Sequence, residues 1–214
     1  MHYPCSYVLV LFLWVDVVST RDSTPIRGNR LPKQQFQLDR AKLKEVVWLI
    51  ASHCPPQELG NVKLHKILYF SDMLFFLHQG QPITGVEYLK QKFGPVARHL
   101  TAAVTELVSE GKLAVTEEEY FGLYKKSYIP KITYKSERLS KDEIKLVKDV
   151  ADFVRGKSAK EISEISHNAA WEAAELGEVL PYFTALRLIP TEVTDSDRNW
   201  AIESARQHAG QRPF

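Results

Sequence analysis

The stretch VKLHKILYFSDMLFFLH, residues 62–78, carries apolar side chains around every face of the helix that its spacing predicts. A helix that is apolar all round is buried, so this segment predicts the centre of the core. Gly80 ends it, because glycine readily leaves the helical conformation. Asp72 is the one acid in the apolar run. We expect it to face a wet edge or to pair with Lys66 or Arg98, in a structural rather than a catalytic role.

A second, amphipathic helix is predicted on the amino-terminal side of this segment. Apolar residues recur there at helical spacing from Asp39 onward, and Pro55 stops the pattern. Residues 20–37 hold four basic residues and two prolines, which is typical of a linker. We therefore expect the folded domain to begin near Leu38.

The apolar run at residues 7–18 resembles a signal sequence but is a poor one. No Lys or Arg precedes it, Asp16 interrupts it, and it is shorter than the roughly 20 residues that span a bilayer. We interpret it as a leading strand or as an extension that the domain does not need.

The segment after the buried helix predicts a third helix and then a hairpin. Gly94-Pro95 predicts the helix start, because proline suits the first helical position, and Gly111 predicts its end. Three short runs rich in aromatic and β-branched residues follow, which predict two or three small antiparallel strands. These runs cover residues 113–116, 120–124 and 128–134.

The carboxy-terminal part of the chain is predicted to be helical again. Two capping boxes, each a serine three residues before a glutamate, predict helix starts after Ser140 and Ser158. We expect the second helix to run unbroken to Gly177, and residues 195–207 to form a last helix.

These patterns predict a mainly α fold with a small antiparallel β-hairpin, in which a winged-helix-like helical core precedes the carboxy-terminal helices. The expected divisions are an extension and linker at residues 1–37, one domain at 38–183 and a tail at 184–214.

Composition excludes several classes of protein. The 214 residues carry a net charge of +2, with 44% hydrophobic and 25% charged residues, which is typical of a globular protein in which only a local patch binds electrostatically. Cys5 and Cys54 have no CxxC partner, which favours a reducing cytoplasm. No phosphate-binding, nucleotide-binding or hydrolase motif is present, and the seven histidines are dispersed. We therefore expect no catalysis, no cofactor, no metal and no membrane partner.

The hairpin carries the clearest surface pattern. Five basic residues lie between Lys125 and Arg138 against one acid, Glu137, and tyrosines are interleaved with them. Two interpretations stay open, namely a phosphate-binding wing and lysines that protect a strand edge, of which edge protection is favoured. The aromatic residues exceed what a short hairpin can bury, so they predict a partner surface, unless the hairpin folds back and buries them. This surface comprises Tyr120, Phe121, Tyr124, Tyr128 and Tyr134, rimmed by Lys125, Lys126 and Lys131.

Several motifs, taken in order, resemble the Panacea domain of SocA-like antitoxins. They are residues 63–70 (KLHKILYF), residues 82–85 with Tyr88, Gly94-Pro95-Val96, Ser166-His167 with Trp171, and Pro181-Tyr182. The resemblance covers roughly residues 38–183. Phe93 departs from it, because many relatives have tyrosine there.

The resemblance implies an antitoxin that binds and neutralises a toxin protein encoded by a neighbouring gene. A winged-helix DNA-binding regulator is the alternative, and a hydrolase is a distant one. Tyr69, His167 and Trp171 combine an apolar body with a polar handle, so they suit either partner binding or a buried hydrogen-bonded cluster. The remaining motif residues are interpreted as scaffold, namely Lys63, Leu64, Leu68, Phe70, Gly85, Gly94, Pro95 and Gly111.

Overall fold

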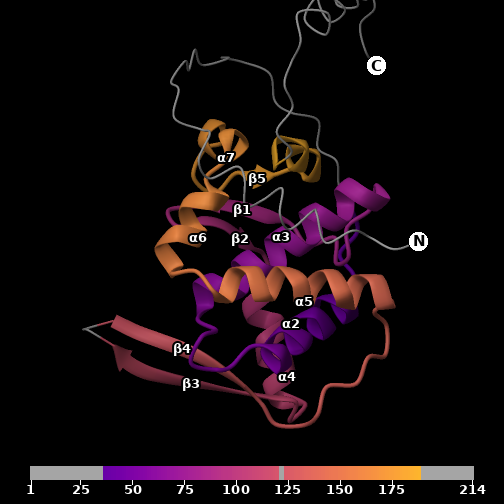
Figure 1. Ribbon diagram of the computed structural model, residues 1–214, viewed down its shortest axis with the longest axis vertical. Helices are drawn as coiled ribbons and strands as arrows, with labels where there is room; N and C mark the ends of the chain where they lie inside the picture. The colour runs from indigo at the N-terminus through magenta and orange to yellow at the C-terminus, as the bar shows by residue number, and fades with distance from the viewer. Residues whose placement is uncertain (1–35, 121–122, 189–214) are drawn as a thin grey trace, which may run out of the picture.

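The computed structural model describes residues 36–120 and 123–188. Helices carry most of the regular structure, and two small antiparallel sheets complete it (Figure 1), so the predicted mainly α class is confirmed. The helices are α2 (Arg40–His53), α3 (Asn61–Gln79), α4 (Leu100–Ser109), α5 (Lys141–Arg155), α6 (Ala159–Ser166), α7 (Ala169–Ala173) and a 3-10 helix (Tyr182–Leu188). The strands are β1 (Tyr88–Gln91), β2 (Gly94–Ala97), β3 (Leu113–Tyr120), β4 (Leu123–Pro130) and β5 (Val179–Leu180). The winged-helix arrangement stays a prediction.

Helix α3 forms the centre of the core, as its all-round apolar sequence predicts. Every residue from Leu64 to Met73 is buried, whereas residues 74–77 are partly exposed. Helices α2, α5 and α6, strand β2 and the 3-10 helix all pack against α3. No helix in the described part of the chain is both long and apolar enough to cross a membrane.

Local sequence signals set the starts of several helices. Asp39 caps α2 by accepting a hydrogen bond from the amide of Lys42 at 2.9 Å. Both predicted capping boxes are present, at Ser140 for α5 and at Ser158 for α6. Caps of this kind each stabilise a helix by about 1 kcal/mol, because they satisfy amides that have no partner inside the helix.

The predicted helix start at Gly94-Pro95 is wrong. These residues open strand β2, and α4 begins at Leu100. Strand β2 is an edge of the sheet β2-β1-β5, where a residue without an amide hydrogen leaves no gap in the pairing. Pro95 therefore suits an edge strand as well as it suits a helix start.

The predicted unbroken helix from Ser158 to Gly177 is also wrong. Helix α6 ends at Ser166, and α7 starts after Asn168, whose side chain caps it by accepting from the amide of Trp171 at 3.0 Å. Asn favours a helix start over a helix interior, because its side chain competes for backbone hydrogen bonds.

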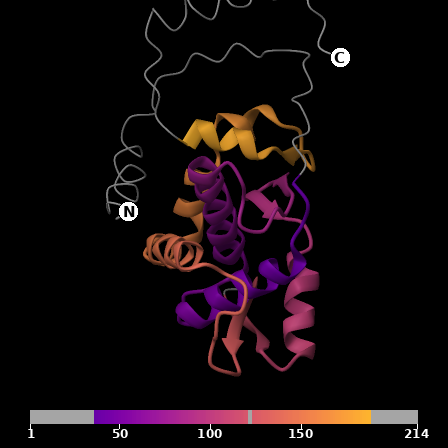
Figure 2. The ribbon, with the colours of Figure 1, turned by 90° about the vertical axis from the view of Figure 1, so that its right-hand side faces the viewer.

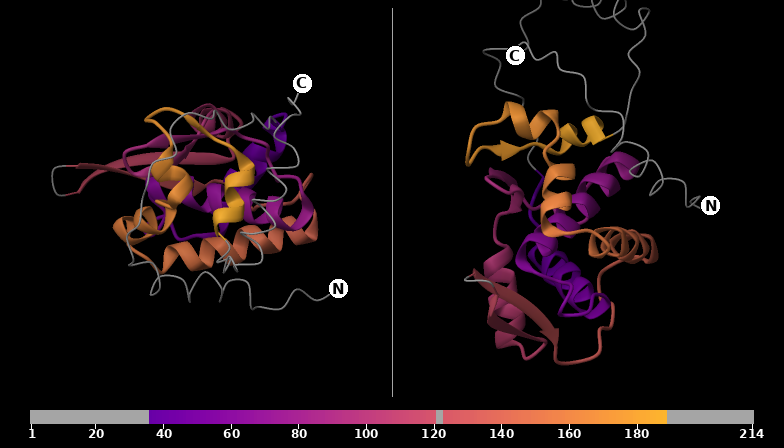
Figure 3. Two further views of the ribbon diagram at one scale, coloured as in Figure 1. Left: turned by 90° about the horizontal axis from the view of Figure 1, so that it is seen from above. Right: turned by 60° about the vertical axis from the view of Figure 1, so that its left-hand side comes forward.

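The hairpin consists of two antiparallel strands, β3 and β4, which pair from Leu113↔Pro130 to Tyr120↔Leu123. The predicted third run, residues 128–134, contributes only its first residues to β4. The hairpin extends away from the helical body (Figures 1 and 3). Together with α4 it lies at the opposite end of the molecule from α7 and the 3-10 helix (Figure 2).

Asp72 faces neither a wet edge nor a lysine or arginine. Its carboxylate is fully buried and accepts hydrogen bonds from the amide of Thr84 at 2.8 Å and from the hydroxyl of Tyr88 at 2.7 Å. Arg98 instead pairs with Glu87. The expected ion pair is therefore wrong, and the geometry of Asp72 is that of a structural residue.

The predicted apolar run at 7–18, most of the linker and the last helix at 195–207 lie outside the described residues. Phe36, the first described residue, packs edge-on against Phe76 at 5.6 Å and Tyr182 at 5.3 Å between ring centroids. The proposed domain boundaries stay predictions.

Candidate functional site

A buried lysine marks the point where α3, β2 and α6 meet. Lys66 is 1% exposed, and its amine donates to the main-chain oxygen of Pro95 at 3.0 Å. Gly94 has a φ of +94°, and a Cβ placed there would lie 2.4 Å from Oγ of Ser166 and 2.5 Å from Nζ of Lys66. Three separate motifs of the sequence therefore converge here. We call Lys66, Gly94, Pro95 and Ser166 the Lys66 cluster.

The electrostatics of the Lys66 cluster are those of a cation without a counter-ion. No carboxylate pairs with Lys66 among the residues that the structure describes, and burial lowers the pKa of its amine to about 7. The neighbouring His65 accepts from the amide of Ala97 at 3.1 Å through Nδ1. Burial, assisted by the charge of Lys66, lowers the pKa of His65 to about 4, so its ring is neutral at neutral pH.

His167 and Trp171 form a stack beside the cluster. Their rings are parallel within 6°, with centroids 3.7 Å apart, and the amine of Lys90 lies 4.3 Å from the centre of the Trp171 ring. Burial lowers the pKa of His167. Three buried polar atoms in this segment have no hydrogen-bond partner among the described residues, namely Nε2 of His167, Nδ2 of Asn168 and Nε1 of Trp171.

The side chains of the Lys66 cluster are closed to solvent. Ser166 is fully buried, and its hydroxyl donates to the main-chain oxygen of Ser163 at 2.7 Å. A serine that acts as a nucleophile must be reached by its substrate, so this geometry gives the hydrolase alternative no support. Within residues 36–120 and 123–188, no group of three or more His, Cys, Asp or Glu side chains is placed to hold a metal.

Tyr69 lies in the core instead of on a partner surface. It is 1% exposed, it packs edge-on against Phe70 and Tyr88, and burial raises its pKa to about 12. Of the two options that the sequence leaves open for Tyr69, the structure shows the buried one. His167 and Trp171 are partly exposed, so partner binding by either of them stays a prediction.

The aromatic residues of the predicted hairpin surface differ in exposure. Tyr124 is 77% exposed, whereas Tyr128 is 3% exposed and donates to Oδ1 of Asn61 at 2.9 Å. The expectation that Tyr128 is exposed is therefore wrong, because its side chain points toward α3. Phe121 and the side chain of Tyr120 lie outside the described residues.

The basic residues of the hairpin are partly neutralised. Lys126 pairs with Glu117 at 3.1 Å, and Lys125 donates to the main-chain oxygen of Gln57 at 2.6 Å. The register places residues 117–119, three glutamates, directly opposite residues 124–126. These charges weaken the case for a phosphate-binding wing, and DNA binding stays a prediction. Lys131 lies at the base of the hairpin and is exposed.

The remaining motif residues occupy structural positions. Leu64, Leu68 and Phe70 are buried in α3. Lys63 is nearer the surface, where its amine donates to the last carbonyl of α5, that of Arg155, at 2.9 Å. Gly85 and Gly111 both have positive φ.

No local sequence pattern predicts that the carboxylate of Glu45 is buried. Glu45 accepts hydrogen bonds from the amides of Glu137 at 2.9 Å and Arg138 at 2.9 Å and from the hydroxyl of Tyr134 at 3.1 Å. Burial acts to raise the pKa of Glu45, but these hydrogen bonds outweigh it and the pKa lies below its usual value. On a helical wheel Glu45 belongs to the polar face, so no local signal marks it.

Fold and site together define a mainly helical domain in which many of the motif residues are buried. Such a domain can act through the surfaces that it presents to other molecules. The chain belongs to the family of SocA-like antitoxins, because the family model described as "Antitoxin SocA-like, Panacea domain" matches residues 64–172, slightly more than half of the 214 residues. Searches of the curated proteins and of the solved structures each found no match.

Proposed function

We propose that this protein is a non-catalytic cytoplasmic antitoxin, which neutralises a toxin protein encoded by a neighbouring gene by binding it directly. The observation that carries the proposal is the family match, which covers most of the buried helix α3, the strand pairs β1-β2 and β3-β4, and helices α4, α5 and α6. Its motifs from α3, β2 and α6 meet in the Lys66 cluster, so they support one common scaffold.

The distribution of exposed groups supports binding through a surface. The Lys66 cluster is closed to solvent, whereas the hairpin presents the ring of Tyr124 at 77% exposure. An exposed aromatic ring near basic side chains is the usual anatomy of a protein-binding surface. Tyr69 and Tyr128 take no part in this proposed surface, because both are buried.

Co-expression with the product of the adjacent gene tests the proposal. We expect the neighbour to stop growth when expressed alone, and growth to recover when this protein is expressed with it. The two proteins should then co-purify. A neighbour that is harmless alone, or that stays lethal beside this protein, overturns the proposal. Steep salt-dependent binding to promoter DNA would identify a regulator instead.

A further inference from the structure

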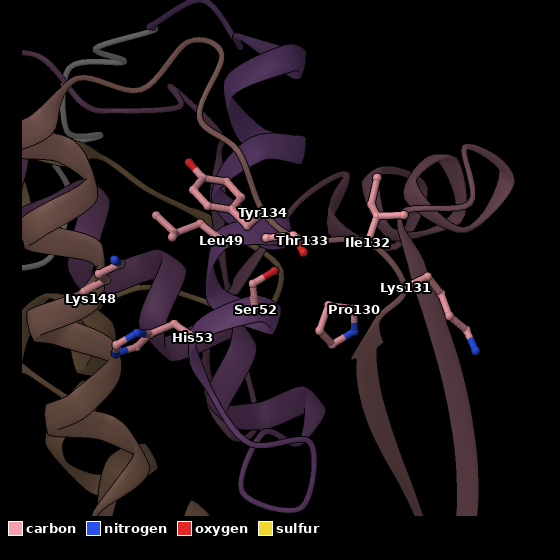
Figure 4. A pocket seen from close by; sticks show the side chains of 9 residues that line it. All are labelled: Leu49, Ser52, His53, Pro130, Lys131, Ile132, Thr133, Tyr134 and Lys148. Carbon is pink, nitrogen blue, oxygen red and sulfur yellow. The ribbon is translucent and has the colours of Figure 1, made fainter.

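A basic groove lies between helix α2, helix α5 and the segment that follows β4. Its volume is about 440 Å³. Figure 4 shows Lys148 of α5 at one end and Lys131 at the other, with Leu49, Ser52 and Pro130 between them.

The charge of this basic groove is unbalanced. Lys131 and Lys148 are both exposed, and neither forms an ion pair with another described residue. No carboxylate lines the groove. Two acids contact its lining or neighbouring residues: Asp152 is engaged by His53 at 3.0 Å and by Arg155, and Glu45 accepts from the hydroxyl of Tyr134 at 3.1 Å and from the amides of Glu137 and Arg138. An occupant that brings negative charge is therefore favoured.

The walls of the groove also offer unused hydrogen-bonding groups. The hydroxyl of Ser52 is buried and has no partner in the part of the chain that the structure describes. The amides of Ile132, Thr133 and Tyr134 donate no backbone hydrogen bond to another described residue. Extended peptides bind through main-chain groups of this kind, so the occupant suited to these walls is an extended segment of protein.

The apolar groups of the groove favour protein over nucleic acid. Ile132 is 49% exposed, and it lies beside Pro130 at the groove wall. An apolar side chain of a partner can bury this surface, whereas a sugar-phosphate backbone cannot.

We propose that the basic groove binds an extended acidic segment of the toxin, in which an apolar residue packs on Ile132 and Pro130 while carboxylates pair with Lys131 and Lys148. The proposal rests on the proposed function, because that function supplies the toxin as the partner. It adds where the toxin docks and which chemistry its docking segment carries.

Charge reversal in the full-length protein tests this proposal. The groove variant combines Lys131→Glu with Lys148→Glu. The control variant combines Lys92→Glu with Lys160→Glu, which changes the net charge equally at two exposed lysines that do not line the groove. Two probes are used, namely the product of the adjacent gene and a fluorescein-labelled peptide with acidic residues on both sides of one leucine.

We expect the groove variant to bind both probes about ten-fold more weakly than the wild type, because attraction becomes repulsion at both ends of the groove. The control variant should bind like the wild type. Equal weakening in both variants, or none in either, overturns the proposal, as does displacement of the peptide by duplex DNA at low concentration.

The two proposals fail in different ways. If the wild type rescues growth and the groove variant rescues equally well and binds the toxin equally tightly, the groove proposal is overturned and the antitoxin function stands. If the wild type does not rescue growth, the antitoxin function is overturned and with it the toxin as the occupant. The circular dichroism of the groove variant should match that of the wild type, since both lysines are exposed.

Discussion

The hydroxyl of Tyr182 lies 3.2 Å from Oδ2 of Asp72, although the two residues are 110 positions apart in the chain. The same hydroxyl donates to the main-chain oxygen of Val86 at 2.7 Å, and Tyr88 donates to the same carboxylate oxygen at 2.7 Å. The fully buried Asp72 therefore joins α3, the strand region and the 3-10 helix in one hydrogen-bonded network.

We predict that Asp72→Ala destabilises the protein strongly. The substitution leaves the amide and hydroxyl of Thr84 and the hydroxyl of Tyr88 without their buried acceptor. The free energy of unfolding should fall by about 3 kcal/mol or more. Asp149→Ala, which removes a surface ion pair with Lys145, should cost about 0.5 kcal/mol at most. Urea denaturation measures both, and similar losses in the two variants would contradict the network role of Asp72.

The buried amine of Lys66 predicts a pH dependence of stability. The pKa of Lys66 is about 7 in the folded protein against 10.5 for an ordinary lysine, so the unfolded chain binds more protons between these pH values. The free energy of unfolding should therefore rise with pH across that window, because the penalty for the buried cation is complete below pH 7 and is relieved above it.

Lys66→Met removes this titration while keeping the volume of the side chain. Urea denaturation from about pH 6 to about pH 9 should show the wild type gaining stability relative to this variant as the pH rises. Parallel pH profiles for the two proteins would show that Lys66 keeps its usual pKa in the folded state.

Gly94 and Gly80 form a matched pair of glycines with positive φ. A Cβ at Gly94 would meet Ser166 and Lys66 at about 2.5 Å or less, whereas a Cβ at Gly80 meets nothing within 4 Å. Gly80→Ala should cost about 1 kcal/mol from backbone strain alone. Gly94→Ala should cost at least about 1 kcal/mol more, because overpacking adds to the strain. Thermal unfolding of the two variants measures the difference, and equal costs would refute the close approach at Gly94.

The two tyrosines of strand β4 should separate binding from folding. Tyr128→Ala removes a buried ring and its hydrogen bond to Asn61, so we expect a loss of about 3 kcal/mol in stability. Tyr124→Ala changes an exposed ring and should alter stability by less than about 0.5 kcal/mol.

If Tyr124 contacts the toxin, its truncation should weaken toxin affinity by about 2 kcal/mol. Titration calorimetry with the purified toxin measures this change, and Tyr128→Phe, which keeps the buried ring, is the control. Unchanged affinity for Tyr124→Ala would remove Tyr124 from the partner surface.

Much of the helical framework could be predicted from local sequence. The capping boxes at Ser140 and Ser158 lie next to the helices that they start. The apolar run of α3 predicts burial whichever elements pack against the helix, because every face of it is apolar. Such signals act over a few residues, so they need no knowledge of the rest of the chain. The antiparallel hairpin and the family motifs are detectable for the same reason.

The candidate surface could be predicted only in part. Tyr124 and Tyr128 are alike in type and lie four positions apart on one strand, yet one is exposed and the other faces Asn61 of α3. The basic groove combines Lys148 with Lys131 and Ser52, which come from three separate segments. Neither the exposure of these tyrosines nor the composition of the groove can be predicted from neighbouring residues in the sequence, because each depends on which elements pack together.

By itself, the sequence determined where α5 and α6 start and which helix is central, because short-range patterns of capping and apolar spacing encode these features. Its ordered motifs also indicated the family to which the chain belongs. Only the tertiary structure decided that Gly94-Pro95 forms an edge strand. A glycine followed by a proline suits either a helix start or a strand edge, and Lys66 and Ser166 pack so close to Gly94 that the strand is selected. The same long-range packing buried the carboxylate of Asp72 and supplied its donors from residues 84, 88 and 182.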